Sequence, residues 1–289
     1  MPTDTNENID GAPETDTPYE YTGCPICGSS KRREGYRFEP PFTAAWCMEC
    51  GTLYLHPRLK EQAMAERYAQ LAYFDGANYQ DYRKQERSLS RTFQSFLKRL
   101  ERRGCLGGRL LELGSGLGWF LRASEGYFDE RIGMDLSTEA ASEASAYADS
   151  VLVGGIEQAP DGPFDLIAAI QVLEHVYDPD PFLSGIAQRL APDGFAAIVV
   201  PDRGSWMRPL LGTRWPSFKI PEHLLYLNET DLRTLFERNG FTNVQRIAYP
   251  HAFPLDILAG FAGLSLPEAL QTVPIWIPGT SLAMIAQRA

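Results

Sequence analysis

The stretch LLELGSGLGWF, residues 110–120, constrains the fold more than any other part of the chain. Its apolar first half predicts a buried strand over 109–113. Glycines at 114, 116 and 118 predict a sharp turn in which a ligand can contact backbone without a Cβ in the way. In open α/β sheets, ligands bind beyond the carboxyl ends of the strands. The sequence therefore predicts a cofactor site in this turn.

Strands and helices alternate along the chain after this turn, which predicts a parallel, doubly wound α/β sheet. We expect further strands over 131–137, 150–155, 195–201, 241–250 and 281–288, and one over 164–176 that runs into a turn. We expect helices from near Leu117, over 138–148 with Ser137 as N-cap, over 179–194 closed by Gly194, and over 228–240 closed by Gly240. A reversed final strand would make the sheet mixed.

The spacing of the loop narrows the choice of ligand. Its glycines follow G-x-G-x-G rather than the dinucleotide pattern G-x-G-x-x-G, and no Walker lysine follows, which excludes a P-loop. Asp135 ends the next strand, where a carboxylate can accept hydrogen bonds from ribose hydroxyls. That position fits NAD and S-adenosylmethionine (SAM) equally. Glu112, just before the loop, favours a sulfonium with an amino-acid tail over a pyrophosphate.

Four motifs in this order, LLELGSGLGWFL, GMDLS, FDLIAAIQVLEHV and LAPDGFAAIVVP, resemble the class I SAM-dependent methyltransferases, in particular the small-molecule branch with V-L-E-H after strand four. The resemblance covers about 105–250 and the last strand. It implies a Rossmann-like class I methyltransferase fold, with a mostly parallel seven-stranded sheet whose last strand is antiparallel. It also implies cofactor contacts: Glu112, Gly114, Ser115, Gly116 and Gly118 around the methionine part, Asp135 at the ribose and Leu136 beside the adenine.

One departure from the family pattern affects the predicted contact to the adenine. The family often carries an acidic residue after strand three, and this chain has Gly154 and Gly155 there. Ile156 is therefore assigned to the cofactor site, with Glu157 as the alternative. Gln171, in the motif after strand four, completes the predicted contacts. A Rossmann-like protein that has lost cofactor binding is the competing interpretation.

Methyl transfer to a hydroxyl or carbon acceptor requires a base, usually His, Asp or Glu. We expect His223 or His175 to act as this base. His175 follows strand four, and His223 lies in the segment 202–227, which is rich in aromatic residues, Arg and Pro. This segment is predicted to be a lid over the acceptor, with Tyr226 as a further catalytic contact. Which residue is the base, and whether O, N or C is methylated, stays open.

Two cysteine pairs, CPICG and CMECG, have the spacing C-x2-C-x19-C-x2-C. This pattern matches a zinc ribbon over 21–58 with Cys24, Cys27, Cys47 and Cys50 as ligands. Four thiolates leave no open coordination position, so the predicted zinc is structural. Iron and disulfides are the alternatives. The ribbon would shape the acceptor pocket or dock a protein partner.

The rest of the chain divides by composition. Residues 1–20 hold six acids and no bases, which leaves 31 of the 37 acids against 27 bases. We expect this acidic tail to be disordered. We assign 59–104 to a helical linker or cap and 105–289 to the methyltransferase domain. No apolar run reaches membrane-spanning length and no signal peptide is evident, so we expect no membrane partner and a cytoplasmic location.

The function expected from these features is methylation of a small molecule in sugar, cell-surface polysaccharide or natural-product biosynthesis. One alternative is an rRNA or tRNA methyltransferase that binds RNA through the ribbon and the basic stretch 83–103. The net charge of the chain after residue 20 is close to neutral, which makes nucleic acid the less favoured partner. A second alternative is a scaffold without catalytic activity. Oligomeric state is not readable from the sequence.

Overall fold

The computed structural model describes residues 17–70, 83–261 and 263–289. At its centre is a seven-stranded sheet with the strand order β12-β15-β10-β9-β6-β7-β8. β15 is antiparallel to both of its neighbours, and all other neighbouring pairs are parallel. This topology confirms the predicted fold class. The strands are β6 (Arg109–Leu113), β7 (Glu130–Asp135), β8 (Ser150–Val153), β9 (Phe164–Ile170), β10 (Leu190–Pro201), β12 (Phe241–Ile247) and β15 (Ser281–Arg288).

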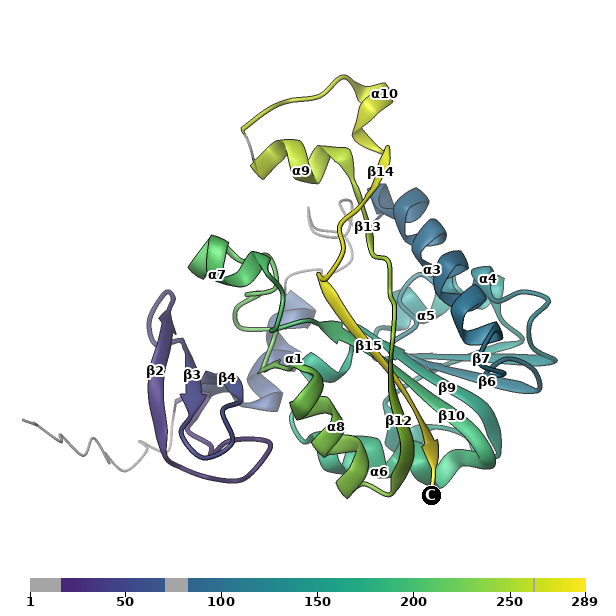
Figure 1. The fold of residues 1–289 in the computed structure, drawn as a ribbon, viewed down its shortest axis with the longest axis horizontal. Coiled ribbons are helices and arrows are strands. Elements are labelled where there is room, and N and C mark those ends of the chain that lie inside the picture. Colours follow the sequence, from purple (N-terminus) through teal and green to yellow (C-terminus); the bar gives the residue numbers. More distant parts are fainter. Residues whose placement is uncertain (1–16, 71–82, 262) are drawn as a thin grey trace, which may run out of the picture.

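Helices cover both faces of this sheet because its central strands are apolar on both faces. Leu166 and Ala168 of β9 pack with α3 (Glu86–Glu101) and α4 (Trp119–Ala123). Ile167 and Ala169 pack with α6 (Pro179–Arg189) and α8 (Glu229–Arg238). Figure 1 shows the two helix pairs on opposite sides of the sheet. The buried apolar face of α3 consists of Leu89, Phe93, Phe96, Leu97 and Leu100.

The predicted helix ends are correct in some places and wrong in others: the helix expected over 138–148 ends at Ala144, and the one expected over 228–240 ends at Arg238. The Ser137 side chain caps α5 (Thr138–Ala144) by accepting a hydrogen bond from the Ala140 amide at 3.2 Å. The helix expected over 179–194 ends instead at Arg189, and β10 begins at Leu190. Pro192 accounts for the difference, because proline disfavours helical backbone in the residue before it.

A second sheet combines segments that are far apart in the sequence. β2 (Arg32–Arg37), β3 (Thr43–Cys47) and β4 (Leu53–His56) form an antiparallel sheet in the cysteine-bearing segment. Its fourth strand is β11 (Leu225–Tyr226), which comes from the segment predicted to be a lid. Figure 1 shows β2, β3 and β4 at one end of the molecule, beside α1 (Glu61–Gln70). Backbone pairing therefore joins the two segments.

The acidic tail differs from the prediction at its end. Tyr19–Glu20 form β1, which pairs with β5 (Arg58–Leu59). Arg58 Nε contacts the Glu20 carboxylate at 2.6 Å, and this ion pair fixes residues that we expected to be disordered. Residues 1–16 lie outside the described residues, as do residues 71–82 of the predicted helical linker.

The remaining elements surround the carboxyl edge of the large sheet. α7 (Met207–Leu211) follows β10, and β13 (Ala252–Pro254) pairs with β14 (Pro274–Trp276). Figure 1 shows α9 (Leu255–Phe261) and α10 (Glu268–Gln271) projecting above the sheet. Within the described ranges, no helix combines the length and apolar character needed to cross a membrane.

A buried polar network joins the cysteine-bearing segment to α8. Thr52 Oγ1 donates to Asp231 Oδ1 at 2.8 Å, and an Arg203 guanidinium nitrogen donates to Asp231 Oδ2 at 2.7 Å. Both side chains of the ion pair are at least nine-tenths buried. Asp231 also accepts the Asn228 amide and so caps its own helix. One carboxylate thus links three parts of the chain.

We expect Asp231→Ala to lower the free energy of unfolding by about 3–5 kcal/mol, because it leaves the Arg203 charge buried without its partner. Urea denaturation measures the change. Glu229→Ala is the matched control, since the ion pairs of Glu229 with Arg233 and Arg246 are exposed. That variant should lose less than about 1 kcal/mol. Equal losses in the two variants would contradict the importance of the buried network.

Candidate active site

The glycine loop follows β6 and leads into α4. Gly114, Gly116 and Gly118 all have positive φ, at 69°, 52° and 74°. A Cβ on Gly114 would lie 2.4 Å from Val172 Cγ2, and one on Gly118 would lie 2.8 Å from Ala144 Cα. The loop is therefore held closely against the end of β9 and against α5. Both the backbone conformation and the lack of space require glycine here.

Asp135 holds the loop to the neighbouring strand. Its Oδ2 accepts a hydrogen bond from the Gly116 amide at 2.8 Å, and its Oδ1 accepts one from the Ser137 amide at 2.9 Å. The Ser115 amide donates to the Met134 carbonyl at 2.8 Å. Burial raises the pKa of Asp135, and the two amides act against that rise. The carboxylate thus lies at the carboxyl edge of the sheet, beside the loop.

Three predicted cofactor contacts near the loop carry buried polar atoms that have no partner in the described part of the chain: Glu112 Oε2, Ser115 Oγ and Gln171 Nε2. Glu112 is fully enclosed, and its burial together with the charge of Asp135 raises its pKa well above the usual value. Gln171 has a φ of 59°, in the left-handed region that side chains rarely adopt. Buried polar groups normally have partners, so these atoms fit a polar ligand such as the methionine part of SAM.

The two predicted contacts to the adenine differ in their surroundings. Leu136 follows Asp135 directly, and 80% of its surface is exposed. Ile156 is only 3% exposed and packs in the apolar core with Phe182 of α6. A Cβ on Gly185 would lie 2.7 Å from Ile156 Cγ1, which shows how tightly this side chain is held. Leu136 is open to a ligand, whereas Ile156 is part of the packing.

The structure brings the two predicted bases together. His175 lies in a 3-10 turn (Leu173–His175) just after β9, and His223 lies just before β11. Their ring centroids are 4.6 Å apart and the rings are nearly perpendicular, at 86°. Burial lowers the pKa of His175 to about 4. Burial also lowers the pKa of His223 well below its usual value, and His175 adds to the effect. Both imidazoles are neutral at pH 7.

Glu174 lies beside these histidines, and the sequence analysis assigned it no role. Its side chain is 0% exposed, and neither carboxylate oxygen has a hydrogen-bond partner among the described residues. Burial raises its pKa to about 8. Potential ligand atoms of Glu174, His175 and His223 all lie within 4.8 Å of one another. The sequence does contain a signal for Glu174, because an acidic residue stands next to a histidine directly after an apolar strand.

This Glu174–His175–His223 cluster shares one edge of the sheet with the glycine loop. β6 and β9 are neighbouring parallel strands, so their carboxyl ends lie side by side. Val172, which closely approaches Gly114, is two residues before Glu174. The topology therefore gathers the predicted cofactor residues and the predicted bases at one place.

Tyr226, the third predicted catalytic residue, lies in an aromatic cluster. Its ring centroid is 4.9 Å from that of Phe218 and 6.2 Å from that of Trp215. The side chain is 1% exposed, and no described residue forms a hydrogen bond with its hydroxyl. Burial raises the pKa of this hydroxyl. The ring therefore helps to anchor segment 202–227 beside β4.

The four paired cysteines form a second cluster. The sulfurs of Cys24 and Cys50 are 3.5 Å apart, as are those of Cys27 and Cys47, and all four lie within 4.8 Å of one another. Tetrahedral zinc with Zn–S bonds of about 2.3 Å needs sulfurs about 3.8 Å apart, which this set fits. Gly28 and Gly51 have φ of 74° and 75° and turn each pair into a knuckle.

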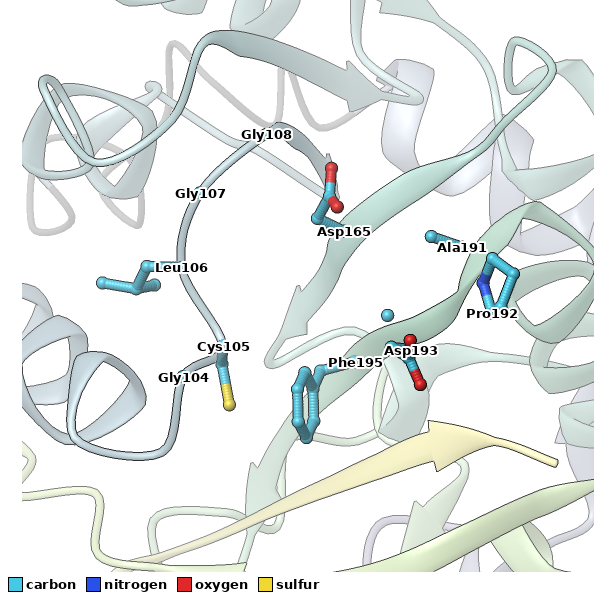
Figure 2. Close-up of a pocket in the computed structure, with 11 residues that line it drawn as sticks. Gly104, Cys105, Leu106, Gly107, Gly108, Asp165, Ala191, Pro192, Asp193 and Phe195 are labelled. Carbon is cyan, nitrogen blue, oxygen red and sulfur yellow. The ribbon is translucent and has the colours of Figure 1, made fainter.

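A cavity of about 460 Å³ lies at the opposite end of the large sheet. Residues 104–108, Asp165 and residues 191–195 line it, and Figure 2 shows these residues around the amino ends of β6, β9 and β10. Asp165, one of its two carboxylates, already accepts the Arg109 amide at 2.7 Å. Ligand sites of such sheets lie at the carboxyl edge, so this cavity is not the candidate active site.

A family model described as a methyltransferase domain matches residues 79–246, more than half of the chain. The chain belongs to the class I SAM-dependent methyltransferases. A ubiquinone biosynthesis O-methyltransferase from Caulobacter sp. (strain K31) is 33% identical to this methyltransferase over 106 residues. That match covers 35% of this chain and 39% of the relative, so the chain spans about two fifths of the length of the curated relative.

Solved structures share the fold of this methyltransferase. The magnesium protoporphyrin IX methyltransferase of Synechocystis PCC 6803 with bound SAH is 15% identical, with a TM-score of 0.54 over 79% of this chain and 100% of that chain. A SAM-dependent methyltransferase from Archaeoglobus fulgidus is 17% identical, with a TM-score of 0.51 over 77% of this chain and 99% of that chain.

We expect Asp135→Ala to weaken SAH binding about 10- to 100-fold, because hydrogen bonds to a charged group contribute about 1.5–3 kcal/mol. Isothermal titration calorimetry measures the affinity. Asp161→Ala is the control, since Asp161 is an exposed carboxylate before β9. Unchanged SAH affinity in Asp135→Ala would contradict the ribose assignment.

We expect the purified protein to contain one zinc per chain in the cysteine cluster, and Cys50→Ser to lose it. Loss of the metal should lower the melting temperature, because metal binding contributes directly to the folding of such small units. Elemental analysis and thermal denaturation check both results. Iron in place of zinc would support the alternative ion, and the absence of any stoichiometric metal would contradict the ribbon.

Proposed function

We propose that this methyltransferase transfers a methyl group from SAM to a hydroxyl group of a small molecule, in sugar, cell-surface polysaccharide or natural-product biosynthesis. The observation that carries the proposal is the contact of two imidazoles, the half-buried His175 and the buried His223, beside the glycine loop. The name of the Caulobacter relative, an O-methyltransferase of ubiquinone biosynthesis, supports an oxygen acceptor.

In this proposal the carboxyl edge of the large sheet binds SAM, which supplies a methyl group already activated by its positive sulfur. Gly114, Gly116 and Gly118 let the methionine part lie against backbone, and Glu112 and Gln171 bind its polar atoms. Asp135 accepts hydrogen bonds from the ribose, and Leu136 covers the adenine. The buried polar atoms of Glu112, Ser115 and Gln171 that have no partner among the described residues support this arrangement.

The transfer needs alignment and removal of one proton. A bond forms between the acceptor oxygen and the methyl carbon while the carbon–sulfur bond breaks and leaves its electron pair on sulfur. The hydroxyl proton would pass to the neutral imidazole of His223 or His175, the two predicted bases. His175 and His223, both neutral at pH 7, are suited to bind that hydroxyl, and positioning of this kind contributes several kcal/mol to the rate.

The segments around this edge would shape the acceptor site. We assign 202–227 to an acceptor lid that is anchored to the cysteine-bearing segment by β11. The hydrogen bond from Arg208 to the Tyr36 hydroxyl at 2.6 Å supports this anchoring. The zinc ribbon over 21–58 would then hold the lid in place, and the methyltransferase domain would be 105–289.

The test is incubation with methyl-labelled SAM and a panel of acceptors: nucleotide sugars, quinols, polyketides and RNA. We expect label in a small hydroxylated molecule, as a methyl ether identified by mass spectrometry. The variant His223→Ala should lower turnover at least about tenfold with SAH affinity unchanged. Label in RNA, or no SAH binding by the wild-type protein, would contradict the proposal.

A further inference from the structure

We propose that Glu174, His175 and His223 bind a divalent transition-metal cation, which holds the acceptor oxygen beside the methyl donor. This site is separate from the cysteine cluster. Its role in catalysis rests on the proposed function above, but the binding of the cation does not.

The positions of the ligand atoms suit one small cation. All three side chains offer an atom within 4.8 Å of the other two. Cis ligands of an ion with bonds of about 2.1 Å lie about 3 Å apart and trans ligands about 4.2 Å apart, so small rotations of the side chains complete the site. Glu174 and His175 are held by the turn after β9, and His223 is held by the start of β11.

The Glu174 carboxylate needs a partner that the described residues do not supply. An isolated buried carboxylate is costly, and such groups normally pair with a cation. Glu174 is 0% exposed, yet neither oxygen forms a hydrogen bond. The exposed Lys219 influences the carboxylate through its charge but forms no hydrogen bond with it. A metal cation between Glu174 and the two imidazoles would satisfy the carboxylate.

The histidines are oriented as metal ligands usually are. His175 Nδ1 is 3.0 Å from the Glu222 carbonyl oxygen, so this nitrogen carries the hydrogen and donates it. That tautomer leaves the lone pair on Nε2, the arrangement in which a backbone carbonyl fixes a metal-binding imidazole. His223 Nδ1 is buried and has no hydrogen-bond partner within the described ranges. Each ring therefore has a nitrogen available for a metal ion.

The ligand set indicates the kind of cation. Two imidazoles and one carboxylate suit Mn²⁺, Fe²⁺, Co²⁺ or Zn²⁺ rather than Ca²⁺, which takes six to eight oxygen ligands. Three protein ligands leave positions open for a substrate oxygen, in contrast to the four cysteines. An acceptor with two adjacent oxygens, such as a vicinal diol or a catechol, would occupy two of these positions.

This arrangement changes the role of the histidines. A cation lowers the pKa of a hydroxyl that it binds, so the acceptor can release its proton to solvent before the transfer. The acceptor oxygen then attacks the methyl carbon as described above. His175 and His223 act as ligands that position the acceptor oxygen, and neither has to accept the proton itself.

The test is a Mn²⁺ titration of the full-length, zinc-loaded protein, followed by electron paramagnetic resonance of free Mn²⁺. We expect one saturable site per chain. Glu174→Gln, which keeps the side-chain size, and His223→Ala should each weaken binding more than about tenfold, since even indirect partners of a metal contribute 10- to 100-fold. His251→Ala is the control, because His251 bonds to Ser281 and stacks on Phe253 outside the cluster.

Two outcomes would overturn the proposal: no saturable binding of Mn²⁺, Co²⁺ or Zn²⁺ below about 1 mM beyond the cysteine site, or unchanged Mn²⁺ affinity in Glu174→Gln. Circular dichroism and SAH titration of each variant exclude misfolding as the cause of lost binding. SAH binding and methyl transfer that persist with EDTA while Mn²⁺ fails to bind would overturn the metal site and leave the proposed function standing. Mn²⁺ binding without SAH binding would overturn the proposed function and leave the metal site standing.

Discussion

The candidate site depends on the parallel pairing of β6 with β7 on one side and β9 on the other. Parallel strands end at the same edge of a sheet, so this pairing places Asp135, the glycine loop and the turn around Glu174 side by side. The hydrogen bond from the Gly116 amide to Asp135 then fixes the loop against β7. The close approach of Gly114 to Val172 fixes the loop against the end of β9.

The same edge concentrates buried acidic side chains that have polar oxygens without partners among the described residues. Glu112 and Glu174 are both enclosed, and burial raises the pKa of each. Neither has a basic side chain bonded to it, unlike Asp231, whose carboxylate is paired with Arg203. Structural carboxylates are satisfied within the protein, whereas these two have unused oxygens. That contrast is why we interpret them as ligand-binding groups.

The cysteine-bearing segment is part of the same structure rather than an appendage. β11 extends its sheet, and the Thr52 hydroxyl bonds to the carboxylate that caps α8. His223 lies two residues before β11, so its position depends on this pairing. A metal in the cysteine cluster would therefore stabilise the candidate active site without taking part in the chemistry.

The sequence by itself determined the fold class and the residues of the glycine loop. Strand and helix periodicity is local, and the positive φ of Gly114 and Gly118 is a local requirement that glycine alone meets without strain. The resemblance of four motifs placed Asp135 and His175 at strand ends. Helix α6 was expected to reach residue 194 but stops at Arg189, because Pro192 disfavours helical backbone in the residue before it.

Only the tertiary structure decided which distant residues meet. The pairing of β4 with β11 and the contact of His175 with His223 join segments whose separation in the chain carries no local signal. Burial decided the rest: it placed Ile156 in the apolar core and left Glu174 enclosed without a partner. Local sequence patterns determine the secondary structure of each segment. Long-range packing determines which polar groups are buried away from water and therefore need a protein or ligand partner.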